Sequence, residues 1–119
     1  MDSNQIREIP ASIGDLHDLE EINFSSNFIA LIPDEIGHCQ KLRWLSVGNN
    51  ALENLPPGLA ALPELLSLSF WKNKVASLPG EFEHINPKLG LSYEENPIAI
   101  NPPEWLKKRG QKKTHECFF

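Results

Sequence analysis

The stretch LRWLSVGNNALENLP, residues 42–56, contains a pattern that recurs along most of the chain. Leu42, Leu45 and Val47 are spaced three and then two residues apart, and Asn50 follows three residues later. The asparagine returns at a constant interval of 23 residues, at Asn4, Asn27, Asn50, Asn73 and Asn96. A fixed interval of this length indicates tandem structural repeats.

Other positions keep the same interval. An aliphatic residue lies two places after each asparagine, at Ile6, Ile29, Leu52, Val75 and Ile98. A proline lies six places after each asparagine, at Pro10, Pro33, Pro56, Pro79 and Pro102. The residue five places after each asparagine is aliphatic in the first four cases, and Asn101 breaks this pattern in the fifth. Because several positions share the same 23-residue interval, the sequence predicts tandem repeats of this length.

The spacing within a repeat predicts its local structure. Apolar residues five and three places before Asn27, Asn50, Asn73 and Asn96 alternate with polar ones, as in a short strand with one buried face. The asparagine is expected to turn the chain, and the proline to start a segment that cannot continue a ladder. Segments such as residues 34–42 have apolar residues three apart, which predicts a helical or 3₁₀ turn. Because one unit cannot bury its apolar face alone, stacked units must share one core.

Residues 9–29 and 32–52 resemble the 23-residue class of leucine-rich repeats found in Ras-pathway scaffolds, plant intracellular Ras-group-related proteins and scribble/erbin-type polarity scaffolds. The resemblance covers nearly all of residues 1–105. It implies an α/β fold, a right-handed leucine-rich repeat solenoid shaped as a short horseshoe. The concave side would carry a parallel sheet and the convex side short helical or 3₁₀ turns. It also implies an intracellular protein-binding scaffold, often in signalling.

The predicted domain organisation follows from where the pattern stops. Residues 1–101 hold about four full repeats and a partial first one, and residues 102–119 form a closing segment and a basic tail. ENPIAINPPEWLKKRG, residues 95–110, resembles the close of the last repeat in this class, with Trp105 and Leu106 covering the final core layer. The first repeat lacks its strand, so we expect either a fragment or an end face that packs on a partner or a second copy.

Charge and cysteine content narrow the class of protein. Residues 1–105 carry 15 acidic and 6 basic side chains, whereas residues 106–119 carry 5 basic side chains and Glu116. The acidic body argues against nucleic acid and membrane surfaces as main partners, and the tail alone offers a weak contact with anionic lipid. Cys39 and Cys117 do not form a disulfide framework, and no signal segment or apolar span is present. We therefore expect a cytoplasmic protein.

The sequence contains no pattern that predicts catalysis. There is no Gly-rich phosphate loop, no nucleophile elbow and no metal-ligand spacing among the histidines and cysteines. The repeat asparagines are expected to satisfy backbone groups, and Cys39 is expected to fill a core position. We predict no enzyme activity, no cofactor, no metal and no small-molecule substrate.

The candidate binding residues lie at strand positions that face the concave side. Trp44 and Trp71 stand out there, because tryptophan is the residue most enriched at binding hot spots. The alternative is that each ring packs over a small neighbour, Trp44 beside Ser67 and Trp71 beside Gly48. The complete predicted set is Glu21, Asn23, Arg43, Trp44, Ser46, Ser69, Trp71, Lys72, Ser92 and Glu94. A partner segment with an apolar or aromatic anchor and basic ends would match these side chains.

Three functional hypotheses remain open at this stage. The leading one is a non-enzymatic interaction module that binds a protein or peptide on its concave sheet. The second is a fragment or regulatory part of a larger leucine-rich-repeat enzyme, such as a kinase, cyclase or ubiquitin ligase. The third is self-association through the uncovered N-terminal face.

Overall fold

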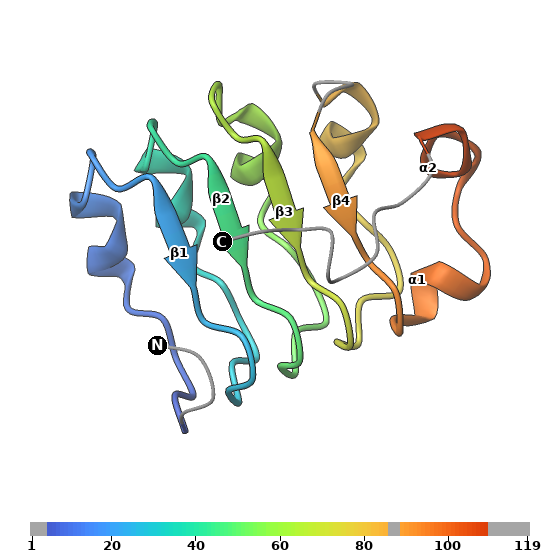
Figure 1. Cartoon of the computed structure of the whole chain (residues 1–119), viewed down its shortest axis with the longest axis horizontal. Coiled ribbons are helices and arrows are strands. Elements are labelled where there is room, and N and C mark those ends of the chain that lie inside the picture. Colours follow the sequence, from blue (N-terminus) through green and yellow to red (C-terminus); the bar gives the residue numbers. More distant parts are fainter. Residues whose placement is uncertain (1–4, 86–88, 110–119) are drawn as a thin grey trace.

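A computed structural model describes residues 5–85 and 89–109 of the chain. Within these residues, short strands alternate with 3₁₀ helices, and two short α-helices follow (Figure 1). The strands are β1 (Glu21–Asn23), β2 (Trp44–Ser46), β3 (Ser67–Ser69) and β4 (Gly90–Ser92). The 3₁₀ helices are η1 (Ala11–Asp15), η2 (Asp34–His38), η3 (Pro57–Ala61) and η4 (Gly80–His84), and the α-helices are α1 (Pro97–Ile100) and α2 (Glu104–Arg109).

The strands form one parallel sheet in the order β1-β2-β3-β4. Neighbouring strands pair in register, so residues that are 23 positions apart in the sequence lie side by side, as Leu45 does with Leu68. The sheet forms one side of the molecule and the 3₁₀ helices lie behind it (Figure 1). The predicted short solenoid, with a parallel sheet on one side and 3₁₀ turns on the other, is confirmed.

Each 3₁₀ helix begins directly after a repeat proline. The φ angles of Pro10, Pro33, Pro56 and Pro79 are −72°, −68°, −70° and −56°. A proline fixes φ near these values and has no N–H to donate, so it ends the extended segment and starts the turn at low cost. One buried apolar side chain then points inward from each turn, at Ile13, Ile36, Leu59 and Phe82.

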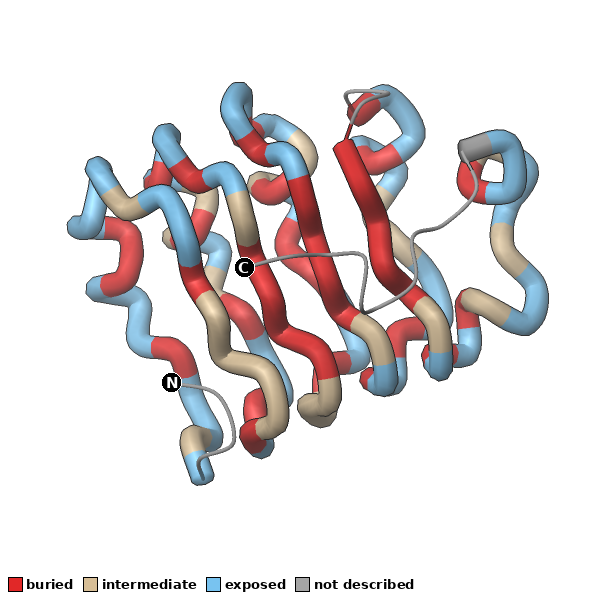
Figure 2. Tube along the Cα trace, in the orientation of Figure 1, coloured by how far each residue is buried: buried red, intermediate tan, exposed pale blue. Residues whose placement is uncertain are grey.

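One hydrophobic core runs through the stacked repeats (Figure 2). Its last layer is closed by the segment after β4, where Leu106 is fully buried and Trp105 packs half-buried against the core. The predicted covering role of these two residues is confirmed. Cys39 is also fully buried, as expected for a core filler. In the described part of the chain, no helix is long and apolar enough to span a membrane.

The repeat asparagines hold the turns after the strands. Asn73 shows the arrangement: its Nδ2 donates to the carbonyls of Phe70, Trp71 and Val47 at 2.9–3.1 Å, and its Oδ1 accepts from Leu52 N at 3.0 Å. Asn50 and Asn96 make the equivalent four contacts one repeat away on either side. The predicted architectural role is confirmed for the repeats that the structure describes, and Asn4 lies outside the described residues.

Candidate interaction surface

The pairing of the strands places the predicted binding residues in rows across the sheet. One row contains Glu21, Trp44, Ser67 and Gly90, and the next contains Asn23, Ser46, Ser69 and Ser92. These are the side chains of alternate strand positions, whereas Ile22, Leu45, Leu68 and Leu91 between them enter the core. The sequence therefore assigned the two faces of the sheet correctly.

The row of small polar residues differs from expectation, because it is not open to solvent. Ser46, Ser69 and Ser92 are 5%, 1% and 0% exposed. Two of these hydroxyls have a neighbouring polar partner: Ser46 Oγ lies 2.6 Å from Ser25 Oγ, and Ser92 Oγ donates to Glu94 Oε1 at 2.7 Å. These serines are therefore buried in the structure and do not project from the face.

The two tryptophans stand in different surroundings. Trp71 is half-buried, and its indole lies directly on Gly48, where a Cβ would overlap the ring. Trp44 is also half-buried and is paired in register with Ser67. The Trp71 ring therefore packs on its small neighbour as one alternative describes, and its half-exposed part leaves the predicted partner contact untested. Trp44 has a serine beside it in place of a glycine.

Ser67 contributes an unusual polar group to this face. It is 7% exposed, and its Oγ is the one buried side-chain oxygen or nitrogen without a hydrogen-bond partner among residues 5–85 and 89–109. Buried polar groups are normally satisfied, because leaving one unpaired costs about 1–3 kcal/mol. A hydroxyl of this kind beside Trp44 was not predicted, because sequence periodicity does not report hydrogen bonding.

Charged side chains border the face on both sides. The Arg43 guanidinium lies 3.9 Å from Glu20 Oε1 and 3.7 Å from Glu64 Oε1, and it is 45% exposed. These distances exceed those of good charge-assisted hydrogen bonds, so the arginine is loosely held. Glu21 is exposed on β1, and Lys72 is exposed in the turn after β3. The predicted border charges are thus present around the tryptophans.

The histidines and cysteines were considered as possible metal ligands or nucleophiles, and the structure describes the surroundings of several of them. In the described segments, no three His, Cys, Asp or Glu side chains are grouped so as to hold a metal ion. Burial raises the pKa of the Cys39 thiol, and its Sγ donates to Ile13 O at 3.3 Å. Such a thiol is a poor nucleophile, because the thiolate is the reactive form. Cys117 lies outside the described residues.

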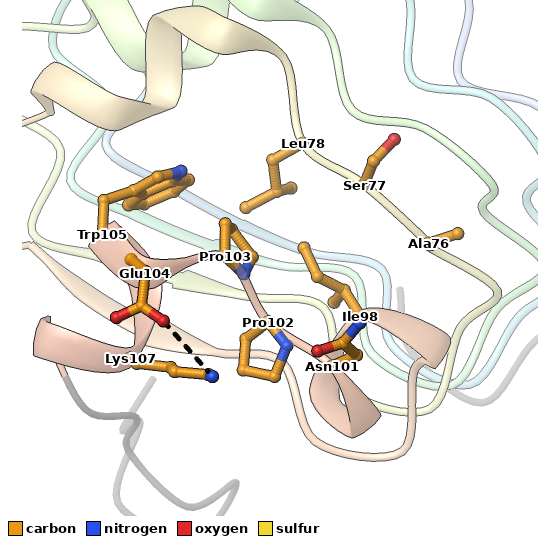
Figure 3. Close-up of a pocket in the computed structure, with 10 residues that line it drawn as sticks. All are labelled: Ala76, Ser77, Leu78, Ile98, Asn101, Pro102, Pro103, Glu104, Trp105 and Lys107. Atoms are coloured by element: carbon orange, nitrogen blue, oxygen red, sulfur yellow. Dashed lines mark ion pairs between the residues drawn. The ribbon is translucent and has the colours of Figure 1, made fainter.

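A groove near the C-terminal end was not predicted from the sequence. It has a volume of about 470 Å³ and lies between the segment after β3 and the closing segment (Figure 3). Leu78, Ile98 and Trp105 give it an apolar side, and the ion pair between Lys107 and Glu104, at 3.5 Å, lies at its rim. The route of the chain through Asn101 and the prolines after it creates this groove.

Known proteins with a similar sequence or structure contain leucine-rich repeats, in agreement with the repeated strands and 3₁₀ helices described above. The Leucine Rich Repeat family profile matches residues 18–39. A leucine-rich-repeat protein of Leptospira interrogans shares 32% identity and a TM-score of 0.78 over 92% of this chain. This chain folds as a leucine-rich-repeat solenoid. No curated protein sequence matches it.

Two plant structures are also similar to this solenoid. The complex of BIR3 and SERK2 from Arabidopsis thaliana matches with 26% identity and a TM-score of 0.67 over 81% of this chain. The plant peptide hormone receptor RGFR1 in complex with RGF2 matches with 33% identity and a TM-score of 0.66 over 75% of this chain. The chain spans 29% of the Leptospira protein, 52% of the matched chain in the BIR3–SERK2 complex and 15% of the RGFR1 chain.

Proposed function

We propose that this leucine-rich-repeat chain is a non-enzymatic, intracellular interaction module of the 23-residue class, a signalling scaffold that binds a protein or peptide on its concave sheet. The observation that carries the proposal is Trp44, a half-buried aromatic ring in the middle of the face, next to the unpartnered hydroxyl of Ser67. Tryptophan is among the residues most enriched at hot spots of protein interfaces.

The similar structures support a protein or peptide as the class of partner. One is a complex between two proteins, and another is a peptide hormone receptor bound to RGF2. The residues of the face agree with this class, because extended peptides are held by side-chain pockets and by polar groups that fix their register. The border carboxylates, such as Glu21 and Glu94, favour a partner segment that carries basic residues beside an apolar anchor.

The proposal can be tested with peptides selected for binding to the purified chain from a random display library. Trp44→Ala should weaken the selected peptides by roughly 30-fold or more, which corresponds to a hot spot of about 2 kcal/mol. Affinity is measured by calorimetry, and the fold of each variant by circular dichroism. Trp44→Ala is preferable to Trp71→Ala, because the Trp71 ring also packs on Gly48.

Ile100→Ala is the matched control, because Ile100 is an apolar side chain 88% exposed outside the sheet. Its loss should leave peptide affinity unchanged. Peptides that bind the Trp44→Ala variant as tightly as the original chain would contradict the assignment of the concave face.

A further inference from the structure

The hydroxyl of Ser67 lies on the concave side of β3 without a hydrogen-bond partner. Leu68, the next residue, is fully buried in the core, so the Ser67 side chain points to the opposite face of the sheet. Ser67 is 7% exposed, and its Oγ has no partner in the described segments. Ser46 on the neighbouring strand differs, because its Oγ lies 2.6 Å from Ser25 Oγ. A buried hydroxyl that the chain leaves unpaired can be satisfied by a polar group from a partner.

Trp44 is the large side chain next to this hydroxyl in the sheet. The register places Ser67 between Trp44 on β2 and Gly90 on β4. Gly90 has no side chain, and the next concave-facing residue along β3 is the small Ser69. A partner group that reaches Ser67 Oγ is therefore expected to contact the half-buried indole of Trp44 as well. Because the Oγ is buried in the free chain, side chains over it must move when this contact forms.

Carboxylates outnumber basic groups around Trp44. Glu20 and Glu64 share one cation, since the Arg43 guanidinium lies 3.9 Å from Glu20 Oε1 and 3.7 Å from Glu64 Oε1. Glu21 lies beside Trp44 in the register of the sheet, is exposed, and makes no ion pair with any described residue. The net charge here is negative after the existing ion pairs are counted. A positively charged partner group is therefore complementary to this part of the face.

We propose that the concave face binds an arginine side chain of a partner peptide at Trp44 and Ser67, an inference that rests on the proposed function. A guanidinium is planar and weakly hydrated, so it stacks on an indole and still donates hydrogen bonds from its edge. Ser67 Oγ accepts one of these N–H groups, and the Glu21 carboxylate offsets the charge. Lysine carries the same charge without a planar group to stack, and citrulline has a similar shape without the charge. The site should thus prefer arginine to both.

The probes are peptides selected on the purified full chain from a random display library. Among peptides that bind through Trp44, arginine should be enriched at one shared position. The most enriched peptide is then synthesised with arginine, lysine or citrulline at that position. Calorimetry should show binding that is about tenfold or more tighter for the arginine peptide than for the other two. The ¹H–¹⁵N indole signal of Trp44 should shift most with the arginine peptide.

Ser67→Ala separates a binding role of the hydroxyl from a structural one. It removes an unpaired group, so the free energy of unfolding, measured by urea titration, should be unchanged or higher. The affinity for the arginine peptide should nevertheless fall about tenfold or more, because the bound guanidinium loses its acceptor. Ser12→Ala is the matched control, since Ser12 is exposed in η1 behind the sheet, and it should leave the affinity unchanged (Figure 1).

The outcomes distinguish this site from the concave-face function as a whole. Peptides that depend on Trp44 but lack a shared arginine, or whose affinity survives Ser67→Ala, would overturn the arginine site and leave the concave-face function in place. A fall in stability that matches the fall in affinity of Ser67→Ala would make the hydroxyl a structural group and overturn its role in binding. A selection that yields no binder, or binders insensitive to Trp44→Ala, would overturn both.

Discussion

Gly48 is the position where packing and the candidate binding face meet. The indole of Trp71 lies on its Cα, so the glycine is needed for space. Sequence reasoning left two interpretations of Trp71 open, a contact for a partner and a ring packed over Gly48. The structure places the Trp71 ring on Gly48, and both Trp71 and Trp44 keep part of their surface exposed, so a contact with a partner stays a prediction for each ring.

Gly48→Ala is therefore expected to be destabilising. A Cβ would overlap the Trp71 ring, and forcing an extra carbon into a packed site costs about 1–3 kcal/mol. The free energy of unfolding is measured by urea titration, and the movement of the indole by the ¹H–¹⁵N signal of Trp71. Gly37→Ala is the control, because its Cβ would meet Gly58 Cα at an ordinary 3.5 Å. Equal stability of the two variants would contradict the packing of Trp71 on Gly48.

The repeat asparagines were predictable because their role depends on short-range geometry. Asn50 Nδ2 donates to the carbonyls of Val47 and Gly48, three and two residues earlier, and the asparagines of the other described turns use the same two positions. The burial of Ser46 and Ser69 was not predictable. Burial depends on groups that the fold brings together from distant parts of the chain, and periodicity does not report these groups. Periodicity thus identifies the residues that build the face and not how deeply each lies.

At the scale of the element, each turn after a strand contains one residue in the left-handed region of the backbone. These residues are Ser26, Asn49, Lys72 and Glu95, with φ between 51° and 60°. Each directly precedes a repeat asparagine. The sequence does not reveal this position, because serine, asparagine, lysine and glutamate share no side-chain property that favours positive φ. The hydrogen bonds of the following asparagine hold the backbone in place and override the local preference.

Lys72→Gly is expected to stabilise the chain. The left-handed conformation costs a non-glycine residue about 1–2 kcal/mol, and the extra entropy of glycine in the unfolded chain offsets about 0.5–1 kcal/mol of that gain. The net effect should be a gain of about 0–1.5 kcal/mol in the free energy of unfolding, measured by urea titration.

Asn49→Gly provides the comparison. Asparagine tolerates positive φ, and Asn49 Nδ2 donates to Ser26 Oγ at 3.2 Å, so this change should be neutral or destabilising. A gain in Asn49→Gly equal to that in Lys72→Gly would show that the cost of the turn does not depend on residue type.

At the scale of the whole molecule, each repeat contacts its neighbours and few other elements. The two ends differ, because the first layer presents Leu16 to solvent while the last layer is covered by Leu106. The sequence predicted the covered last layer from the apolar pair in α2, but it placed Leu16 at a core position, equivalent to Cys39, Leu62 and Ile85. It did not predict the groove beside Trp105, which depends on the path of the chain between α1 and α2.

Leu106→Ala is expected to loosen one end of the solenoid and leave the other intact. Removing a fully buried leucine costs about 2–5 kcal/mol, and in a stack of nearest-neighbour contacts this loss acts first on the adjacent layer. Amide hydrogen exchange should accelerate in β4, α1 and α2 while β1 and β2 keep their protection. Ile100→Ala, at a side chain 88% exposed, should leave the exchange pattern unchanged. Uniform acceleration across all four strands would mean that the repeats unfold as one cooperative unit, and that α2 stabilises the whole sheet rather than its last layer.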